Sequence, residues 1–355
     1  MFYTLLSFSI GLYLLPYVST FANYTPLKNR SSYVHITAKS LFKFFISPML
    51  VLFLLNYTWV SPVIGAWFGH ITFSSLQHTT TLLILFTFFV IWHTYLTSFV
   101  FNSKEIYDYT IVVYNFVLWT IFLFYANNIF TVIFIIETLS VLTTLTVVTA
   151  PFSSSYFYSV NLNNNTLYFS PSLPTTLLNT LTFLFWISLV SSLILFVFLI
   201  FFYVQIVTFN FLAVEAIFNH LLVVSTYKQI LSALVTTFLF ILVMFFKCGV
   251  VPLYVWKPVF FKGMPLHVIY LYTCFFYYFL LLFFTYFLIV YLDDLTYYNS
   301  LLLVMLLLIG VLSLFVILLE SFYIKAFLAM SSVLNTLVVF LAVTGVSTYT
   351  IFVNL

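Results

Sequence analysis

Apolar residues run along this chain in long blocks separated by short polar connections. A helix that crosses the hydrocarbon core of a bilayer needs roughly 20 mainly apolar residues, and apolar runs of about that length recur throughout the chain. The pattern predicts ten spanning helices, over residues 2–22, 41–67, 82–101, 110–126, 129–150, 175–203, 229–252, 266–292, 300–319 and 326–348.

Composition agrees with a chain that lies largely in lipid. Hydrophobic residues make up 65% of the 355 residues and charged residues 5%, whereas soluble domains carry about 25% charge. The first apolar run lacks the basic segment and the small-residue cleavage site of a signal peptide, so we interpret it as a retained helix. The sequence therefore predicts an all-α polytopic membrane protein.

Residue usage also limits what single side chains can mean. The chain has 48 Phe and 27 Tyr but only 7 Gly, and an A/T-rich organellar genome explains this bias, because Phe and Tyr have A/T-rich codons. A single aromatic residue is therefore no sign of a binding site. Cys248 and Cys274 fall in predicted helices, and two cysteines define neither a disulfide framework nor a metal-site spacing.

Basic residues in the connections indicate orientation, because they concentrate on the side from which helices are inserted. The even-numbered connections carry Lys228 together with the acidic residues Glu215, Asp293 and Asp294. We therefore predict that the odd-numbered connections face the matrix or cytoplasm and that the N-terminus faces the opposite side. The basic residues of the odd connections are Lys28, Arg30, Lys39, Lys43, Lys104, Lys257, Lys262 and Lys325.

Two formal charges lie deep inside predicted helices: Glu137 in TVIFIIETLSVLTTL and Lys247 in FILVMFFKCGVV. A charge at the bilayer centre costs about 2.5 to 3.5 kcal/mol on insertion scales, and such groups mostly mark ion or proton pathways. Desolvation favours a neutral lysine, and an adjacent carboxylate favours the charged form. We predict that the two residues face each other as a proton switch; a purely structural ion pair is the alternative.

Prolines follow Lys247 closely. Pro252 and Pro258 should remove backbone hydrogen bonds from the helix expected over 229–262 and break it near Pro252. Broken helices occur in membranes where protein or a wet cavity covers the backbone, and they recur at ion sites of transporters. If the helix continues after the break, Lys247 lies near its middle.

The residues around this break carry a resemblance. The fixed positions of the pattern are Phe246, Lys247, Gly249, Pro252, Trp256, Pro258, Gly263 and Pro265. The pattern resembles the signature of the antiporter-like subunits of respiratory complex I, and within them the NADH dehydrogenase subunit 2 family. Two further blocks agree: Glu137-x-x-Ser140 is similar to the glutamate of the family's fifth helix, and Lys325-x-x-x-Ala329-x-Ser331-Ser332 resembles the start of its tenth.

Several positions depart from the family pattern. Tyr254 and Val259 stand where the family usually has a histidine and an acid, and Asn335 replaces a histidine of the tenth helix. A second family lysine, on the eighth helix, falls at Tyr277, which cannot hold a positive charge. The chain also ends at Leu355, after about ten helices, so it is expected to be truncated relative to the fourteen-helix, inverted-repeat antiporter fold.

The resemblance implies a proton-translocating subunit of NADH:ubiquinone oxidoreductase in the mitochondrial inner membrane, with the N-terminus towards the intermembrane space. It implies that Glu137 and Lys247 couple quinone reduction to proton movement, and Tyr277 falls at the position of a second lysine of the path. His267, early in the same predicted helix, is a weaker candidate because histidine titrates near neutral pH; a satisfied structural histidine is the alternative. It also implies structural roles for Pro252, Trp256, Pro258, Gly263, Pro265 and Lys325.

The same resemblance sets the expected partners and cofactors. We expect no cofactor in this chain, because NAD, FMN, iron–sulfur clusters and ubiquinone would belong to other subunits, and we expect bound phospholipid. The expected partners are other membrane-arm subunits, lipid and a separate chain that supplies the missing C-terminal helices, with no nucleic acid. We interpret 1–355 as a single membrane domain, in which 1–126, 129–262 and 263–355 hold helices 1–4, 5–7 and 8–10.

Other classes remain to be weighed. A scaffold subunit that does not pump and a stand-alone cation/proton antiporter both fit the motif. A di-haem cytochrome or haem–copper oxidase needs clustered histidines, and the six histidines here are scattered. No Gly-rich phosphate loop is present. His93 lies in an apolar run, His70 and His78 lie in a polar connection, and VEAIFNHLLVV, with Glu215, Asn219 and His220, is interpreted as an interfacial or lateral helix.

Overall fold

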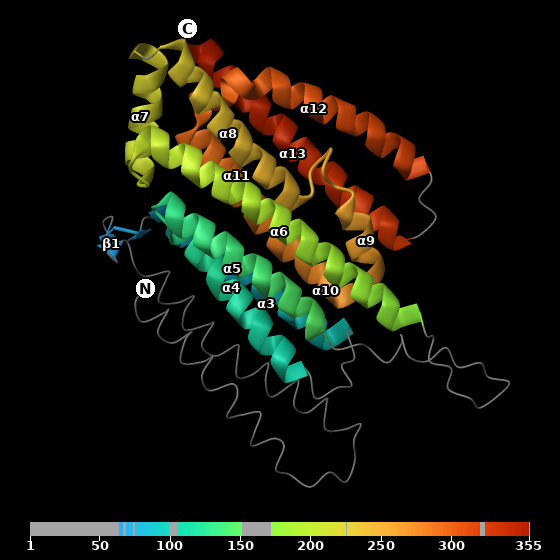
Figure 1. Cartoon of the computed structure of the whole chain (residues 1–355). Helices are drawn as coiled ribbons and strands as arrows, with labels where there is room; N and C mark the ends of the chain where they lie inside the picture. The colour runs from blue at the N-terminus through green and yellow to red at the C-terminus, as the bar shows by residue number, and fades with distance from the viewer. Residues whose placement is uncertain are drawn as a thin grey trace, which may run out of the picture. The chain divides into compact units, whose positions relative to one another are not determined.

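A computed structural model describes residues 64–66, 69–73, 75–98, 106–150, 172–224, 226–319 and 324–354. These residues are mainly helical (Figure 1). The predicted helix 2–22, most of the predicted helix 41–67 and most of the polar segment 151–173 lie outside the described residues. The described residues divide into two compact units, and each is presented by itself.

The first unit holds a short hairpin and a group of packed helices. Strand β1 (Ile64–Ala66) pairs antiparallel with β2 (Ile71–Phe73). Helix α3 (Ser75–Ser98) packs on α4 (Ile106–Tyr125) and on the π-helical turn Tyr272–Phe276, which follows α10 (Leu266–Leu271). The later part of α5 (Ile129–Val148) also belongs to this unit.

The hairpin corrects the predicted end of the second helix, which was placed at residue 67. Residues Ile64–Ala66 form a strand instead, in register with Ile71–Phe73. A short apolar segment is compatible with either a strand or a helix, because hydropathy alone does not separate the two. Pairing with the nearby segment Ile71–Phe73 makes Ile64–Ala66 a strand.

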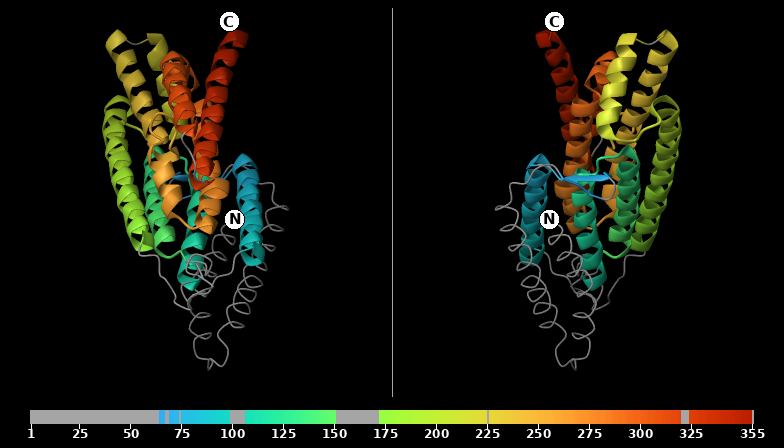
Figure 2. Two further views of the ribbon diagram at one scale, coloured as in Figure 1. Left: turned by 90° about the vertical axis from the view of Figure 1, so that its right-hand side faces the viewer. Right: turned by 90° about the vertical axis from the view of Figure 1, so that its left-hand side faces the viewer.

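The second unit contains the larger set of helices. It comprises the start of α5, through Glu137, together with α6 (Ser172–Ile206), α7 (Phe211–Val224), α8 (Tyr227–Cys248), α9 (Trp256–Gly263), α11 (Tyr277–Tyr291), α12 (Asp293–Leu319) and α13 (Ile324–Asn354). Helix α11 packs against α7, α8, α12 and α13. Helices α12 and α13 lie side by side, as Figure 2 shows from two directions.

The predicted apolar runs became helices wherever the structure describes them in full. Five of these helices are long and apolar enough to cross a membrane: Ile129–Val148, Leu178–Ile206, Tyr227–Cys248, Leu266–Tyr291 and Ile324–Ala342. Shorter apolar helical stretches cover Thr79–Trp92, Val112–Tyr125 and Leu303–Leu318. The chain is therefore a polytopic helical membrane protein, while the count of ten spans stays a prediction.

Polar side chains inside these apolar helices are satisfied locally. The hydroxyl of Thr120 donates to the carbonyl of Val117 (2.7 Å), and that of Thr236 donates to the carbonyl of Ala233 (2.8 Å). Bonds of this kind, to a carbonyl one turn earlier, let threonine lie in an apolar helix without an unpaired hydroxyl. The Thr residues of the spans therefore need no separate functional explanation.

The ends of α8 are set by specific residues. At its start, Thr226 and Gln229 form a capping box, in which the Gln229 side chain accepts a hydrogen bond from the Thr226 backbone N–H (3.0 Å). At its end, Gly249 adopts the left-handed conformation with φ 58° and its N–H donates to the carbonyl of Phe245. A glycine in this conformation is the usual helix terminator, because it has no Cβ to clash.

The helix break predicted near Pro252 is present. Helix α8 ends at Cys248, and α9 begins only at Trp256. Between them, two tight backbone bonds hold the turn: the N–H of Leu253 donates to the carbonyl of Val250 (2.8 Å), and that of Lys257 donates to the carbonyl of Tyr254 (2.9 Å). The break therefore places Lys247 in the last turn of α8 rather than near the middle of a continued helix, which corrects the predicted position.

Candidate functional site

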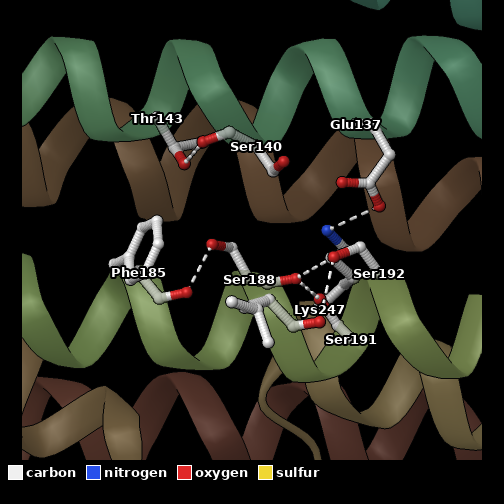
Figure 3. Close-up of polar contacts among 9 residues, drawn as sticks. Glu137, Ser140, Thr143, Phe185, Ser188, Ser191, Ser192 and Lys247 are labelled. Carbon is white, nitrogen blue, oxygen red and sulfur yellow. Dashed lines mark hydrogen bonds and ion pairs between the residues drawn. The ribbon is translucent and has the colours of Figure 1, made fainter.

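Glu137 and Lys247 face each other across two helices of the second unit. The Nζ of Lys247 lies 3.2 Å from Oε1 of Glu137 (Figure 3). The side chain of Lys247 is 8% exposed and that of Glu137 is 34% exposed. The predicted pairing of these two charges is therefore observed, and it is the one ion pair among the residues that the structure describes.

The start of α5 is fixed in place before Glu137 is reached. The backbone N–H of Ile129 donates to the carbonyl of Phe209 (2.9 Å), and that of Phe211 donates to the carbonyl of Asn127 (3.3 Å). Asn128 and Asn210 form an isolated antiparallel bridge at the same place. These bonds join the N-terminal end of α5 to the N-terminal end of α7, so the carboxylate projects from an anchored helix.

Lys247 occupies a favourable end of its own helix. It lies in the last turn of α8, where the partial negative charge of the helix C-terminus stabilises a cation. Pairing with a carboxylate adds to this stabilisation, whereas desolvation opposes it. The charged form of Lys247 thus depends on the Glu137 carboxylate, which could move away from it.

Three serines of α6 are drawn in the same close-up as the ion pair, and sequence reasoning did not single them out (Figure 3). Ser191 and Ser192 each donate to the carbonyl of Ser188 at 2.8 Å, and Ser188 donates to the carbonyl of Phe185 at 2.8 Å. The signal was present in the sequence, since serines three and four residues apart share one face of a helix.

The residues of the family-like pattern gather at and after the break. Trp256 is buried at the start of α9, Pro258 lies in its first turn and Gly263 ends it. Pro265 is the N-cap residue of α10. Pro252 lies in the turn between α8 and α9. The structural roles expected for these positions stay a prediction.

A close approach holds the break against α12. A Cβ atom added to Gly310 would lie 1.3 Å from Cγ1 of Val251 and 2.5 Å from its Cβ. Only a glycine permits this contact, because any other side chain would occupy the space of Val251. Sequence reasoning missed Gly310, which lies in an apolar run without any motif around it.

Lys325 contacts the chain just after α9. Its Nζ donates a hydrogen bond to the carbonyl of Met264 at 2.7 Å. This bond ties the start of α13 to the chain just after α9, and the two helices also pack directly on each other. The connection that follows the break is thereby held by a side chain from elsewhere in the sequence.

Lys257, which the sequence places in an odd-numbered connection, is buried: its side chain is 0% exposed. Its Nζ lies 4.4 Å from the centroid of the Tyr277 ring, a cation–π contact. Burial became possible because the break turns α9 back against α13 and α11, which hydropathy of the segment could not reveal.

The surroundings of Lys257 disfavour its charge. Along the sequence, Lys257 falls after the candidate span Tyr227–Cys248 and before the candidate span Leu266–Tyr291, so it belongs to neither. Burial lowers the pKa of its ammonium from 10.5 to about 7, and the nearby Cys248 opposes this shift. The lysine can therefore exchange a proton near neutral pH.

Tyr277 and His267 are both buried, in different settings. Tyr277 is the first residue of α11. Its ring centroid lies 4.4 Å from Nζ of Lys257 and 6.2 Å from the ring centroid of Trp256. His267 belongs to the first unit, where its ring meets the edge of Tyr109 with centroids 5.5 Å apart. The structure thus brings Tyr277 to a buried cation and leaves the predicted role of His267 a prediction.

Fold and site together define a class: a polytopic helical membrane protein with a partly buried ion pair at the end of a broken helix. Within the described part of the chain, no group of three or more His, Cys, Asp or Glu side chains could hold a metal ion. No protein-family model matches the chain, and no curated protein matches its sequence. The resemblance to the antiporter-like subunits therefore rests on the motif residues.

Proposed function

We propose that this chain is a proton-translocating, antiporter-like subunit of mitochondrial NADH:ubiquinone oxidoreductase. The observation that carries the proposal is the ion pair between Glu137 and Lys247, with 3.2 Å between Nζ and Oε1, at the end of a helix that breaks immediately afterwards. Ionisable groups buried in spans are costly and mostly mark ion or proton pathways.

The pair would act as a switch on the protonation of Lys247. While the Glu137 carboxylate lies beside it, the ammonium is stabilised; when the carboxylate moves away, desolvation favours the neutral amine and the proton leaves. The proposal requires water at the break to accept that proton, where the backbone between Cys248 and Trp256 is not helical; irregular backbone occurs in membranes where protein covers it or where it lines a wet cavity. Return of the carboxylate would favour protonation again.

The setting in complex I is supported by the pattern that runs from Phe246 to Pro265. In such a complex, this chain binds no redox cofactor; NAD, FMN, iron–sulfur clusters and ubiquinone belong to other subunits. Its partners are other membrane-arm subunits and phospholipid. The organellar composition, with 48 Phe and 27 Tyr, supports the mitochondrial inner membrane as its location.

Two other functions use the same residues. A scaffold subunit that does not pump is favoured by Tyr277, which cannot carry the positive charge of the family lysine at that position. A stand-alone cation/proton antiporter is compatible with the same ion pair. The first predicts that loss of Lys247 leaves proton pumping intact, and the second predicts that the chain does not comigrate with NADH dehydrogenase activity.

The test replaces Lys247 with Met in the assembled enzyme. The band containing this chain is first identified on a native gel stained for NADH dehydrogenase activity, and the purified enzyme is then reconstituted in vesicles. We expect Lys247→Met to lower the number of protons moved per electron, while Lys228→Met, an exposed lysine on the same helix, leaves that ratio unchanged. An unchanged ratio in Lys247→Met would exclude the proposed role.

A further inference from the structure

Lys257 is a fully buried cation that the Glu137–Lys247 mechanism does not use. It is 0% exposed, while Lys262, on the same short helix, is exposed. Among the described residues, its Nζ has no hydrogen-bond acceptor. Burying an unpaired ammonium is costly, and such groups usually shift their protonation instead. The position therefore requires an explanation beyond packing.

Two contacts hold the lysine in place. The ring of Tyr277 faces its Nζ at 4.4 Å and stabilises positive charge through its π electrons. The aliphatic stem packs on Gly249, where an added Cβ would lie 2.7 Å from Cε and 2.9 Å from Cδ of the lysine. Gly249 ends the helix that carries Lys247, so the stem of Lys257 lies against the end of that helix.

Among the residues that the structure describes, the titratable groups around Lys257 provide no anion to fix its charge. Cys248 of α8 interacts with it electrostatically, and Tyr277 of α11 offers its ring. Helix α13 packs on α9, but its Lys325 is a cation whose Nζ is bound to the Met264 carbonyl. The ring supports the ammonium and burial supports the neutral amine, so neither form is locked.

We propose that Lys257 is a second protonatable group of the proton route, placed after the helix break and held under the Tyr277 ring. The proposal rests on the proposed function, in which Lys247 is the first such group. It gives the route a cation on each side of the break: Lys247 in the last turn of α8 and Lys257 in the first turn of α9.

The step moves a proton and no electrons. The Lys257 ammonium gives its proton to water on the α9 side of the break and becomes a neutral amine. The amine is reprotonated by the proton that Lys247 releases, passed through water at the break. Tyr277 stays neutral in this step, because its ring, and not its hydroxyl, stabilises the ammonium.

The first measurement tests whether Lys257 titrates, independently of pumping. The thermal stability of the wild-type enzyme in lipid nanodiscs is compared with that of Lys257→Met between pH 6 and pH 10. This window contains the pKa of Lys257 in the folded state, about 7, and most of the interval up to its usual value of 10.5. Below a pH of about 7 the buried ammonium of Lys257 destabilises the folded state by a constant amount. Above it the folded state loses the proton first, so the wild type gains stability as the pH rises.

We therefore expect Lys257→Met to be more stable than the wild type at pH 6, with a difference in Tm that narrows as the pH rises above about 7. Lys262→Met, on the exposed side of the same helix, should give a difference that does not change in this way. A Lys257→Met difference that is independent of pH would overturn the proposal, because the lysine would then hold one protonation state throughout.

The second measurement separates this proposal from the proposed function. In reconstituted vesicles, we expect Lys257→Met to lower the number of protons per electron and Lys257→Arg, which keeps a permanent charge, to lower it as well. If Lys247→Met lowers the ratio and both Lys257 variants leave it unchanged, the second group is excluded and the first stands. If none of these variants changes the ratio, the proposed function fails.

Variants of Tyr277 provide a further check that does not remove the lysine. Tyr277→Phe keeps a ring over the ammonium, whereas Tyr277→Leu removes it. We expect the pH at which stability begins to rise to stay in place in the Phe variant and to fall in the Leu variant, because an unsupported ammonium loses its proton more readily. Equal shifts in both variants would contradict stabilisation by the ring.

Discussion

Glu137 and Lys247 differ in burial, and this difference decides which of them depends on the other. Lys247 is 8% exposed and Glu137 is 34% exposed. Removing the carboxylate leaves an ammonium that is almost fully enclosed by the described residues, whereas removing the ammonium leaves a carboxylate that they enclose less completely. The lysine is therefore the member of the pair whose charge requires the contact.

This asymmetry predicts the outcome of a double-mutant cycle. We expect Glu137→Gln to destabilise the protein by about 2 kcal/mol, below the range for a fully buried pair because the described residues enclose Glu137 only in part. Lys247→Met should cost less, and the double variant should be more stable than Glu137→Gln alone. The free energies of unfolding in mild detergent, at one pH and one salt concentration, measure these differences. Strictly additive effects would mean that the two groups do not interact.

The position of a single residue in the site could be predicted from the sequence where its type is unusual for its surroundings. A lysine or glutamate in an apolar run is conspicuous, so both members of the ion pair were predicted. The burial of Lys257 could not be predicted from the sequence, because the residue lies in a connection between two apolar runs, five residues before Lys262. Only the contact with Gly249 and Tyr277, which lie elsewhere along the chain, reveals that it is buried.

At the scale of elements, the break between α8 and α9 depends on α12. Val251 fills the space that a side chain at Gly310 would need, with 1.3 Å between its Cγ1 and an added Cβ. A loop that breaks a helix has few regular hydrogen bonds of its own. Its conformation is therefore stabilised by the close contact with the neighbouring helix.

This contact predicts the effect of Gly310→Ala. We expect the added methyl group to displace Val251 and to destabilise the protein by about 1–3 kcal/mol, the usual cost of overpacking. Leu312→Ala, at a position on the same helix that is 71% exposed, is the matched control and should change stability by less than about 0.5 kcal/mol. Thermal unfolding monitored by tryptophan fluorescence compares the two. Equal stability of Gly310→Ala and the wild type would show that the break is free to move away from α12.

The elements were largely predictable, with two instructive exceptions. Long apolar runs became helices, and Pro252 marked the break, since both follow from local residue preferences. The π-helical turn Tyr272–Phe276 inside the predicted helix 266–292 was not foreseen. Such a turn depends on how the flanking residues pack, and no residue type in YTCFF specifies it. The strand Ile64–Ala66 was missed for a similar reason, because its partner lies outside the apolar run.

At the scale of the whole molecule, the outward side chains of α6 indicate where lipid lies. The span Leu178–Ile206 is only 22% buried, and its exposed side chains include Trp186 at 63%, Leu193 at 58% and Phe196 at 61%. In water such a surface would be unstable, whereas in a bilayer it costs nothing. A face of this kind needs no partner protein to explain it.

Membrane placement and the broken helix can be tested together by cysteine labelling. The background is Cys274→Ser, in which the remaining Cys248 is buried. Single cysteines then replace Lys228, at the start of α8, or Lys262, near the end of α9. Both positions are exposed. If α8, the break and α9 cross the membrane as one unit, a membrane-impermeant maleimide labels Lys228→Cys and Lys262→Cys from opposite sides. Leu193→Cys, at the middle of α6, should react only with a lipid-soluble maleimide.

The labelling pattern also decides between two forms of the proton route. Opposite-side labelling means that Lys247 and Lys257 lie within a segment that crosses the membrane, so protonation of the two lysines can carry a proton from one side towards the other. Labelling of both cysteines from the same side would mean that the chain returns at the break. In that arrangement Lys257 could exchange protons with one compartment only, and net transport would require another path through the other helices.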